Sequence, residues 1–229
     1  MSKNIITISR QFGSGGRTVG KMLSEKLGIP FYDKELVKQV ADETGFDAGF
    51  IEENGEFSPS KSIFSFAMSQ GIPVVQNGLS MSDFFFCVQR QVILKLAEQP
   101  CVIVGRGADY ILRDREDCFN VFIHADMQSR TERIVRLYGE SEKKPEQRLA
   151  DKDKKRKIYY KHYTDREWGD AKNYDMCLNS GKIGIEKFKR AEIGYQTIQQ
   201  FDACSAIRPQ RLPAAGGAAQ KSVWEVLVM

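Results

Sequence analysis

The feature that most constrains this chain is a glycine-rich stretch near its start, between two apolar segments. Residues 5–9 are apolar and largely β-branched, which is typical of a buried parallel strand. Residues 10–18 carry three glycines, and residues 19–27 then place valine and leucine at every fourth position, as an amphipathic helix does. Residues 29–33 are again apolar and end in a carboxylate. The order of strand, glycine loop, helix and strand predicts the beginning of an α/β fold.

A glycine loop between a strand and a helix has a physical use. Glycine allows positive φ and a close approach of the backbone to a ligand. The N–H groups at the start of the helix point at that ligand, and the helix dipole favours negative charge there. We therefore interpret residues 10–18 as a phosphate-binding loop. A tight turn without a ligand is the alternative.

The loop departs from the regular P-loop pattern, G-x-x-x-x-G-K-[ST]. Arg10 stands where the first glycine belongs, and Gly16 stands where the lysine belongs. The next residue, Arg17, is predicted to supply the missing positive charge. Thr18 is predicted to place its hydroxyl on a magnesium ion.

Composition limits the class of protein. The chain has 229 residues, 41% of them hydrophobic, which suits one large domain or a core with a small inserted lobe. The net charge of +4 is mild and suggests an anionic ligand rather than a nucleic-acid coat. No signal peptide or membrane-spanning run is evident, so we expect a cytoplasmic protein without a membrane or nucleic-acid partner. The five cysteines form no C-x-x-C pair, which argues against zinc and a disulfide framework.

The rest of the chain alternates predicted strands and helices. Further strands are expected at 101–104, 119–124 and 173–180, and the main helices at 34–44, 83–99, 127–138, 146–163 and 185–201. This alternation predicts a parallel sheet covered by helices on both faces. The composition changes after residue 207, and residues 208–229 are expected to form a flexible extension.

Basic side chains gather after the third strand and on two later helices. Arg106 lies between two glycines just beyond the strand at 101–104, where open α/β sheets bind ligands. Arg130, Arg133 and Arg136 repeat along one side of the helix at 127–138, for which a solvated basic face is the alternative, above all at Arg136. The helix at 146–163 is too polar for a core element. We interpret it as a lid that closes over an anion, with a solvated helix held by ion pairs as the alternative.

The chain resembles the cytidylate kinase-like family, within the P-loop kinases of the nucleoside monophosphate type. The resemblance covers about residues 3 to 202. Its most specific pieces are residues 8–17, 31–35, 105–107, 168–170 and 173–175. It implies a three-layer P-loop kinase fold with a five-stranded parallel sheet, within a domain of residues 1–207. It also implies a helical substrate-binding insertion at about 45–80 and a basic lid at about 138–165.

The resemblance also implies roles for particular residues. The loop that holds the ATP phosphates corresponds to Gly13, Ser14, Gly15, Gly16, Arg17 and Thr18. The residues implied to bind the acceptor are Asp33, Arg106, Asp109 and Asp153, although Gly107 replaces an aspartate of the family pattern. The lid arginines that clamp the transferring phosphoryl group correspond to Arg130, Arg133 and Arg156.

These expectations give a leading function and two alternatives. The leading hypothesis is phosphoryl transfer from ATP with Mg²⁺ to a nucleoside monophosphate, most of all (d)CMP, with Arg17, Arg130, Arg133, Arg156 and Asp33 at the reaction centre. A regulatory nucleotide-binding module without kinase activity is one alternative, favoured by Gly16 and Gly107. A kinase of another small acceptor is the other. The sequence leaves the oligomeric state open, a homodimer included.

Overall fold

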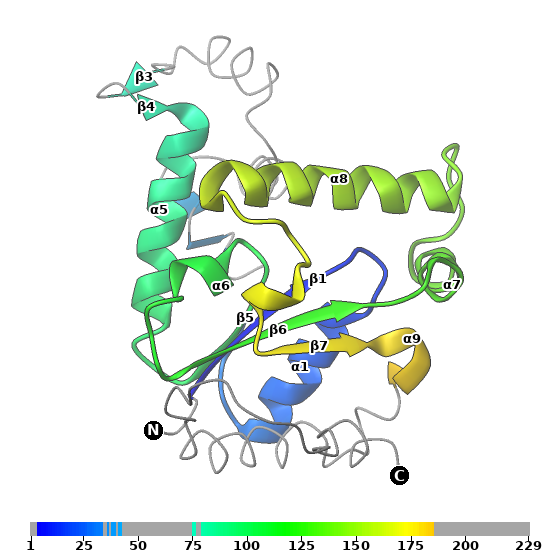
Figure 1. The fold of residues 1–229 in the computed structure, drawn as a ribbon, viewed down its shortest axis with the longest axis horizontal. Coiled ribbons are helices and arrows are strands. Elements are labelled where there is room, and N and C mark those ends of the chain that lie inside the picture. The colour runs from blue at the N-terminus through cyan, green and yellow to red at the C-terminus, as the bar shows by residue number, and fades with distance from the viewer. Residues whose placement is uncertain are drawn as a thin grey trace, which may run out of the picture.

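The computed structural model describes residues 4–33, 36, 38–39, 41–42, 75–76 and 79–185. Its main feature is a five-stranded sheet in the order β2-β5-β1-β6-β7, in which every neighbouring pair is parallel. The strands are β1 (Ile5–Arg10), β2 (Phe31–Tyr32), β5 (Cys101–Val104), β6 (Cys118–His124) and β7 (Met176–Asn179). The first strand of the chain is therefore the central one (Figure 1).

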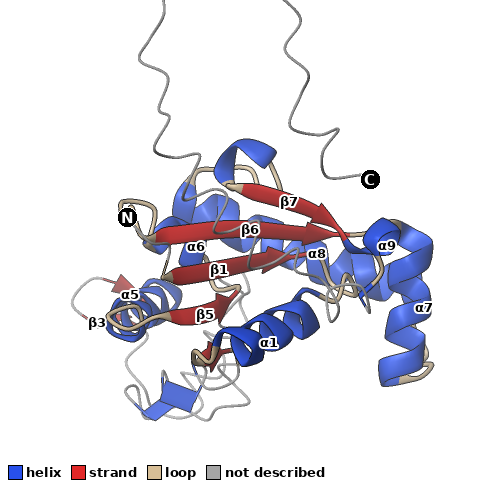
Figure 2. Ribbon diagram, turned by 90° about the horizontal axis from the view of Figure 1, so that it is seen from below, coloured by secondary structure: helices blue, strands red, loops and turns tan. Residues whose placement is uncertain are grey.

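Alternate residues of the central strands build two cores. Ile6 and Ile8 of β1 pack with Val19 of α1 (Gly16–Leu27) on one face of the sheet. Ile5 packs on the other face with residues of α5 (Met81–Leu96) and α6 (Ala108–Ile111). Figure 2 shows α1 and α6 on opposite sides of the strands. Because β1 and β5 are covered on both faces, their continuous apolar sequence is explained.

Two helices lie beyond the strands. The helix α7 (Met127–Tyr138) is capped by Asp126, whose carboxylate accepts a hydrogen bond of 2.8 Å from the Ser129 amide. The helix α8 (Pro145–Thr164) runs from α7 towards α5 (Figure 1). At its far end Tyr163 stacks on Phe86 of α5, with ring centroids 4.1 Å apart. Although half of the residues of α8 are charged, the helix buries Leu149 and Tyr160 and so packs on the body of the protein.

The predicted three-layer architecture is confirmed, but several predicted boundaries were wrong. The second strand comprises only Phe31–Tyr32, and the last strand comprises Met176–Asn179 rather than 173–180. The 3₁₀ helix η1 (Ala171–Asn173) precedes that strand, and α9 (Ser180–Ile183) follows it directly. The side chain of Asn179 accepts hydrogen bonds from the Gly181 and Lys182 amides, and so caps the start of α9.

One small element was missed. The strands β3 (Val75–Gln76) and β4 (Leu79–Ser80) pair antiparallel at the end of the insertion at about 45–80, which was expected to be helical. Most of the predicted insertion at 45–80, nearly all of the helix predicted at 185–201 and the extension at 208–229 lie outside the described residues. Among the helices that the structure describes, none has the length and apolar character needed to cross a membrane.

Candidate active site

The loop between β1 and α1 presents the start of a helix to the carboxyl edge of the sheet. Gly13 and Gly15 have φ of 79° and 81°, which favours glycine at both positions. Gly15 is the N-cap of α1 and contributes no side-chain hydrogen bond. The Val19 amide donates to the Gly15 carbonyl over 3.0 Å, so the helical hydrogen bonds begin there. The amides of the first turn come before this first helical hydrogen bond and have no carbonyl of α1 to bind. This is the usual arrangement of an anion site at the start of a helix.

A buried ion pair fixes the back of this loop. Asp153 of α8 accepts a 2.7 Å hydrogen bond from the Phe12 amide through one carboxylate oxygen. Its other oxygen lies 2.5 Å from Nη1 of Arg130 of α7, and Nη1 also donates to the Phe12 carbonyl over 3.3 Å. Arg130 and Asp153 are 7% and 9% exposed. The pair thus joins α7, α8 and the loop, and it places Arg130 at the back of the loop.

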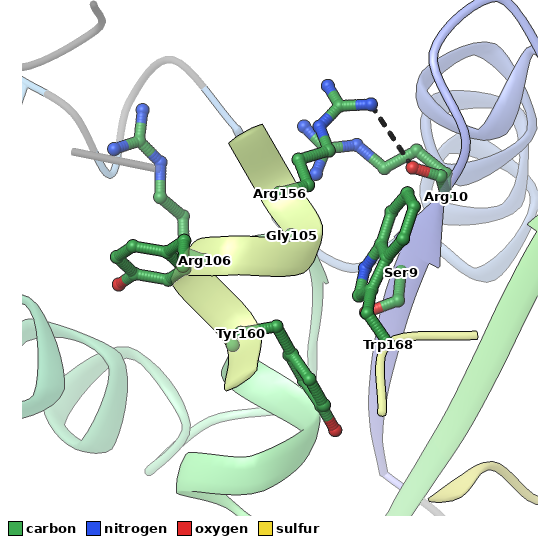
Figure 3. A pocket seen from close by; sticks show the side chains of 9 residues that line it. Ser9, Arg10, Gly105, Arg106, Arg156, Tyr160 and Trp168 are labelled. Carbon is green, nitrogen blue, oxygen red and sulfur yellow. Dashed lines mark hydrogen bonds between the residues drawn. The ribbon is translucent and has the colours of Figure 1, made fainter. Parts of the chain in front are cut away.

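Arginine side chains line a pocket beside the loop. The pocket encloses about 260 Å³ of empty space, including its opening to solvent. It lies where β1 and β5 end, and it is lined by Ser9, Arg10, Gly105, Arg106, Gly107, Arg156, Tyr159, Tyr160 and Trp168. Figure 3 shows Arg106 on one side of this space and Arg156 with Arg10 on the other. Three guanidinium groups around one pocket favour an anionic ligand.

The turn after β5 is held in an unusual conformation. Gly105, Arg106 and Gly107 have φ of 76°, 62° and 65°. A left-handed conformation at Arg106 costs about 1–3 kcal/mol, and such strain persists only where its surroundings enforce it. Gln89 of α5 provides part of that support, since its Nε2 donates to the Arg106 carbonyl over 2.9 Å and contacts the Tyr159 hydroxyl at 2.7 Å. The turn is therefore locked between α5 and α8.

Asp109 lies behind the pocket wall and is 3% exposed. Its carboxylate accepts hydrogen bonds from the Ser9 hydroxyl at 3.1 Å and from the Tyr160 hydroxyl at 2.6 Å. Burial raises the pKa of Asp109, and the two hydrogen bonds and Arg166 oppose that rise. Asp109 does not line the pocket, so its position is that of a residue that orients Ser9 and Tyr160.

Two further predicted arginines lie at the loop. Arg156 of α8 is largely buried, and its Nη1 donates to the Arg10 carbonyl over 3.2 Å. Arg133 of α7 donates through Nη2 to the Thr18 hydroxyl over 2.8 Å. Burial and the neighbouring Arg136 lower the pKa of Arg133. A phosphate beside Arg133 would relieve this unfavourable environment.

Arg17 takes a different direction from the one predicted. Its Nε lies 2.5 Å from the Asp33 carboxylate at the end of β2, and its side chain is 56% exposed. The structure therefore brings Arg17 and Asp33 together, but at the strand β2 rather than over the glycine loop. The role of Arg17 as the replacement cation stays a prediction that its position does not support.

The described residues do not form a magnesium site by themselves. No group of three or more histidine, cysteine, aspartate or glutamate residues within the described ranges could hold a metal ion. The predicted ligand, Thr18, receives its hydrogen bond from a cationic group, Arg133.

Sequence reasoning missed several residues of this site. Arg10 was noted only as a departure from the loop pattern, and Ser9 only as part of a strand. Gln89 carried a sequence signal, because it is a polar residue in the apolar stripe of its helix. In the structure it is 3% exposed. No short-range signal pointed to the contact of Tyr160 with Asp109, which are 51 residues apart.

The sheet order, the glycine loop after the central strand and the helices on both faces define the α/β fold of P-loop kinases. A family model described as the cytidylate kinase-like family matches residues 5–182. The chain belongs to the cytidylate kinase-like family.

The chain is also similar to named relatives and to a solved structure. A cytidylate kinase of Archaeoglobus fulgidus is 27% identical over 187 residues, which cover 79% of this chain and 88% of the relative. A cytidylate kinase of Pyrococcus horikoshii is 22% identical over 185 residues, which cover 80% and 83%. The crystal structure of an uncharacterized protein from Eubacterium ventriosum is 29% identical, with a TM-score of 0.61, over 87% of this chain and 98% of that one.

The buried ion pair predicts a large difference between two aspartates of α8. Asp153→Ala leaves Arg130 buried without its partner and is expected to lower the free energy of unfolding by about 3–5 kcal/mol. Asp151 is the matched control, because its pair with Lys143 at 2.9 Å is exposed. Asp151→Ala is expected to leave urea unfolding unchanged. Equal, small effects of both substitutions would contradict the role given to Asp153.

The buried carboxyl of Asp109 predicts a pH dependence. Its pKa is raised above the ordinary value of 3.8, so the folded state holds this proton at a pH where the unfolded chain has released it. The contribution of Asp109 to stability therefore falls as the pH rises between the unfolded and the folded pKa. We expect Asp109→Asn to gain stability relative to the wild type as the pH is raised from about 4 to about 8. Urea unfolding across this range is the measurement, and a constant difference would contradict the prediction.

Proposed function

We propose that the protein transfers the γ-phosphoryl group of ATP with Mg²⁺ to the phosphate of a nucleoside monophosphate, cytidylate first. One observation carries this proposal: the uncapped start of α1 and the arginine-lined pocket lie side by side at the carboxyl edge of β1. Phosphoryl transfer between two nucleotides needs two neighbouring anion sites. Membership of the family and the names of the two archaeal relatives support the choice of acceptor.

The proposed donor site is the loop of Gly13 to Thr18. The phosphates of ATP would accept hydrogen bonds from the first amides of α1, where the helix dipole favours negative charge. Arg133 lies at the Thr18 hydroxyl, so it is close enough to turn to the outer phosphates. The magnesium ion neutralises part of the phosphate charge when it is bound.

The proposed acceptor site is the pocket. The monophosphate group would lie against Arg106, whose turn is held by Gln89. Arg156 stands on the opposite side, at the carbonyl of the last residue of β1 (Figure 3). Tyr159 and Trp168 provide aromatic walls for the rest of the acceptor.

The reaction proposed for this arrangement is a direct in-line displacement. An ionised oxygen of the acceptor phosphate forms a bond to the γ-phosphorus of ATP. The bond from that phosphorus to the β–γ bridging oxygen breaks, and its electron pair leaves with ADP. The acceptor becomes a nucleoside diphosphate. Since the attacking oxygen is already ionised, the protein needs no general base, and its contribution is positioning and positive charge.

Arg130 and Asp153 have a positioning role in this proposal. They contact each other and the backbone of Phe12, so they hold the loop in the shape that presents its amides. Asp33 and Arg17, paired at the end of β2, are proposed to orient the acceptor from the other side.

A nucleotide-binding regulatory module is the second candidate. It is favoured by the absence of a lysine at Gly16 and by the pairing of Arg17 with Asp33. In that case the same two anion sites would bind nucleotide without turnover.

A coupled assay for ADP formation, with purified protein, ATP, Mg²⁺ and a panel of nucleoside monophosphates, tests the proposal. We expect turnover with at least one monophosphate, and cytidylate to be the best acceptor. Arg156→Ala is expected to lower kcat/KM by about 100-fold, because it removes a charged donor at the boundary of the two sites. Lys157→Ala is the matched control, since Lys157 is the exposed neighbour on α8.

The outcomes separate the two candidates. Turnover that falls with Arg156→Ala but not with Lys157→Ala supports the kinase. Tight ATP binding in calorimetry without turnover of any monophosphate, even at high enzyme concentration, would contradict the kinase and support the regulatory module.

A further inference from the structure

Two of the three departures from the P-loop pattern, Arg10 and Gly16, face each other in space; the third is Arg17, at the serine or threonine position. A Cβ atom at Gly16 would lie 2.5 Å from Cβ and 3.0 Å from Cγ of Arg10. The distance of 2.5 Å is shorter than real Cβ contacts, and it involves the rigid base of the arginine side chain, while the distance of 3.0 Å is tight. A lysine at 16 is therefore incompatible with an arginine at 10 in this position. The two unusual residues are therefore coupled, because an arginine at 10 requires a glycine at 16.

The side chain of Arg10 crosses the region where the missing lysine would begin. Arg10 is the last residue of β1, and Gly16 is the first residue of α1. Beyond this crossing Arg10 lines the arginine-rich pocket. Figure 3 shows its side chain running towards that of Arg156. Arg10 thus joins the phosphate-binding start of α1 to the proposed acceptor pocket.

We propose that Arg10 supplies, from the end of β1, the positive charge that the P-loop pattern assigns to a lysine at 16. Gly16 is glycine so that the stem of Arg10 can lie across the start of α1. This inference rests on the proposed function and adds a catalytic residue to it. It also assigns the charge to a different arginine from Arg17, which is paired with Asp33.

The chemistry of the guanidinium group suits this role. Its planar fork donates two parallel hydrogen bonds to two oxygens of one phosphoryl group. Placed between the two sites, it would stabilise the charge on the γ-phosphoryl oxygens while the bond to the bridging oxygen breaks and the bond to the acceptor oxygen forms. Arg10 neither gives up nor takes a proton in this step.

The surroundings of Arg10 keep it in place. Nη1 of Arg156 donates to the Arg10 carbonyl over 3.2 Å and lies 3.8 Å from the Asp153 carboxylate. The ion pair that fixes the loop therefore also fixes the backbone from which Arg10 extends. This support is what a positioned catalytic charge requires.

The first experiment measures anion binding without any reaction. Calorimetric titration with inorganic tripolyphosphate is expected to give at least a tenfold weaker Kd for Arg10→Ala than for the wild type, because a charge-assisted contact is lost. Arg10→Lys, which keeps the charge, is expected to recover part of the affinity. Lys21→Ala is the control, because Lys21 is exposed on α1, where it pairs with Glu25. It should bind as the wild type does.

The second experiment tests the coupling. Gly16→Lys alone is expected to lower Tm and weaken tripolyphosphate binding, because the new side chain overlaps Arg10. The double substitution of Arg10→Gly with Gly16→Lys restores the first glycine and the lysine of the regular pattern, while Arg17 still stands at its serine or threonine position. This double variant is expected to recover both Tm and binding. Non-additive effects in this double-mutant cycle would show that residues 10 and 16 are coupled.

Three outcomes decide the matter. Wild-type affinity in Arg10→Ala, together with a large loss in Arg17→Ala, would overturn the inference and return the role to Arg17. Additive effects of the two substitutions in Tm and binding would also overturn it. Loss of binding in Arg10→Ala and recovery in the double variant would support it even if the wild type turned over no monophosphate, in which case the proposed kinase function alone would fail.

Discussion

One buried carboxylate holds the site together. Asp153 of α8 binds the Phe12 amide with one oxygen and Arg130 of α7 with the other, while Arg156 lies one helical turn further along α8. The charge of Arg130 is compensated inside the protein, so the pair can be buried without a lone charge. The glycine loop, α7 and the predicted lid helix are thereby fixed as one unit, and the start of α1 keeps the direction that an incoming phosphate needs.

Positive charge is concentrated where the sheet ends. Arg10, Arg106 and Arg156 surround one pocket, and Arg133 lies at the Thr18 hydroxyl nearby. Guanidinium groups gathered in this way repel each other, and a phosphate group relieves that repulsion. The strained turn at Arg106 also points to an anionic ligand. Its support by Gln89 would have little purpose in a turn that only connects β5 to α6. These features support the proposed anionic ligand.

The sequence predicted the fold well because its signals are local. Short apolar runs gave the five strands, and the spacing of valine and leucine gave α1, since both depend on near neighbours. The site was harder to predict because its contacts are distant in sequence. The direction of Arg17 depends on Asp33, and the place of Asp109 depends on Tyr160. A Cβ atom at position 16 would lie 2.5 Å from Cβ of Arg10, and the spacing of residues in the sequence does not reveal this overlap.

The central claim is that the first amides of α1 bind the phosphates of a nucleotide. A crystal structure with a non-hydrolysable ATP analogue, Mg²⁺ and cytidylate tests it most directly. We expect phosphate oxygens of the ATP analogue about 3 Å from the amides of Gly16 and Arg17, and the cytidylate phosphate against Arg106. A nucleotide bound elsewhere, with the start of α1 in contact only with protein atoms or solvent, would contradict it.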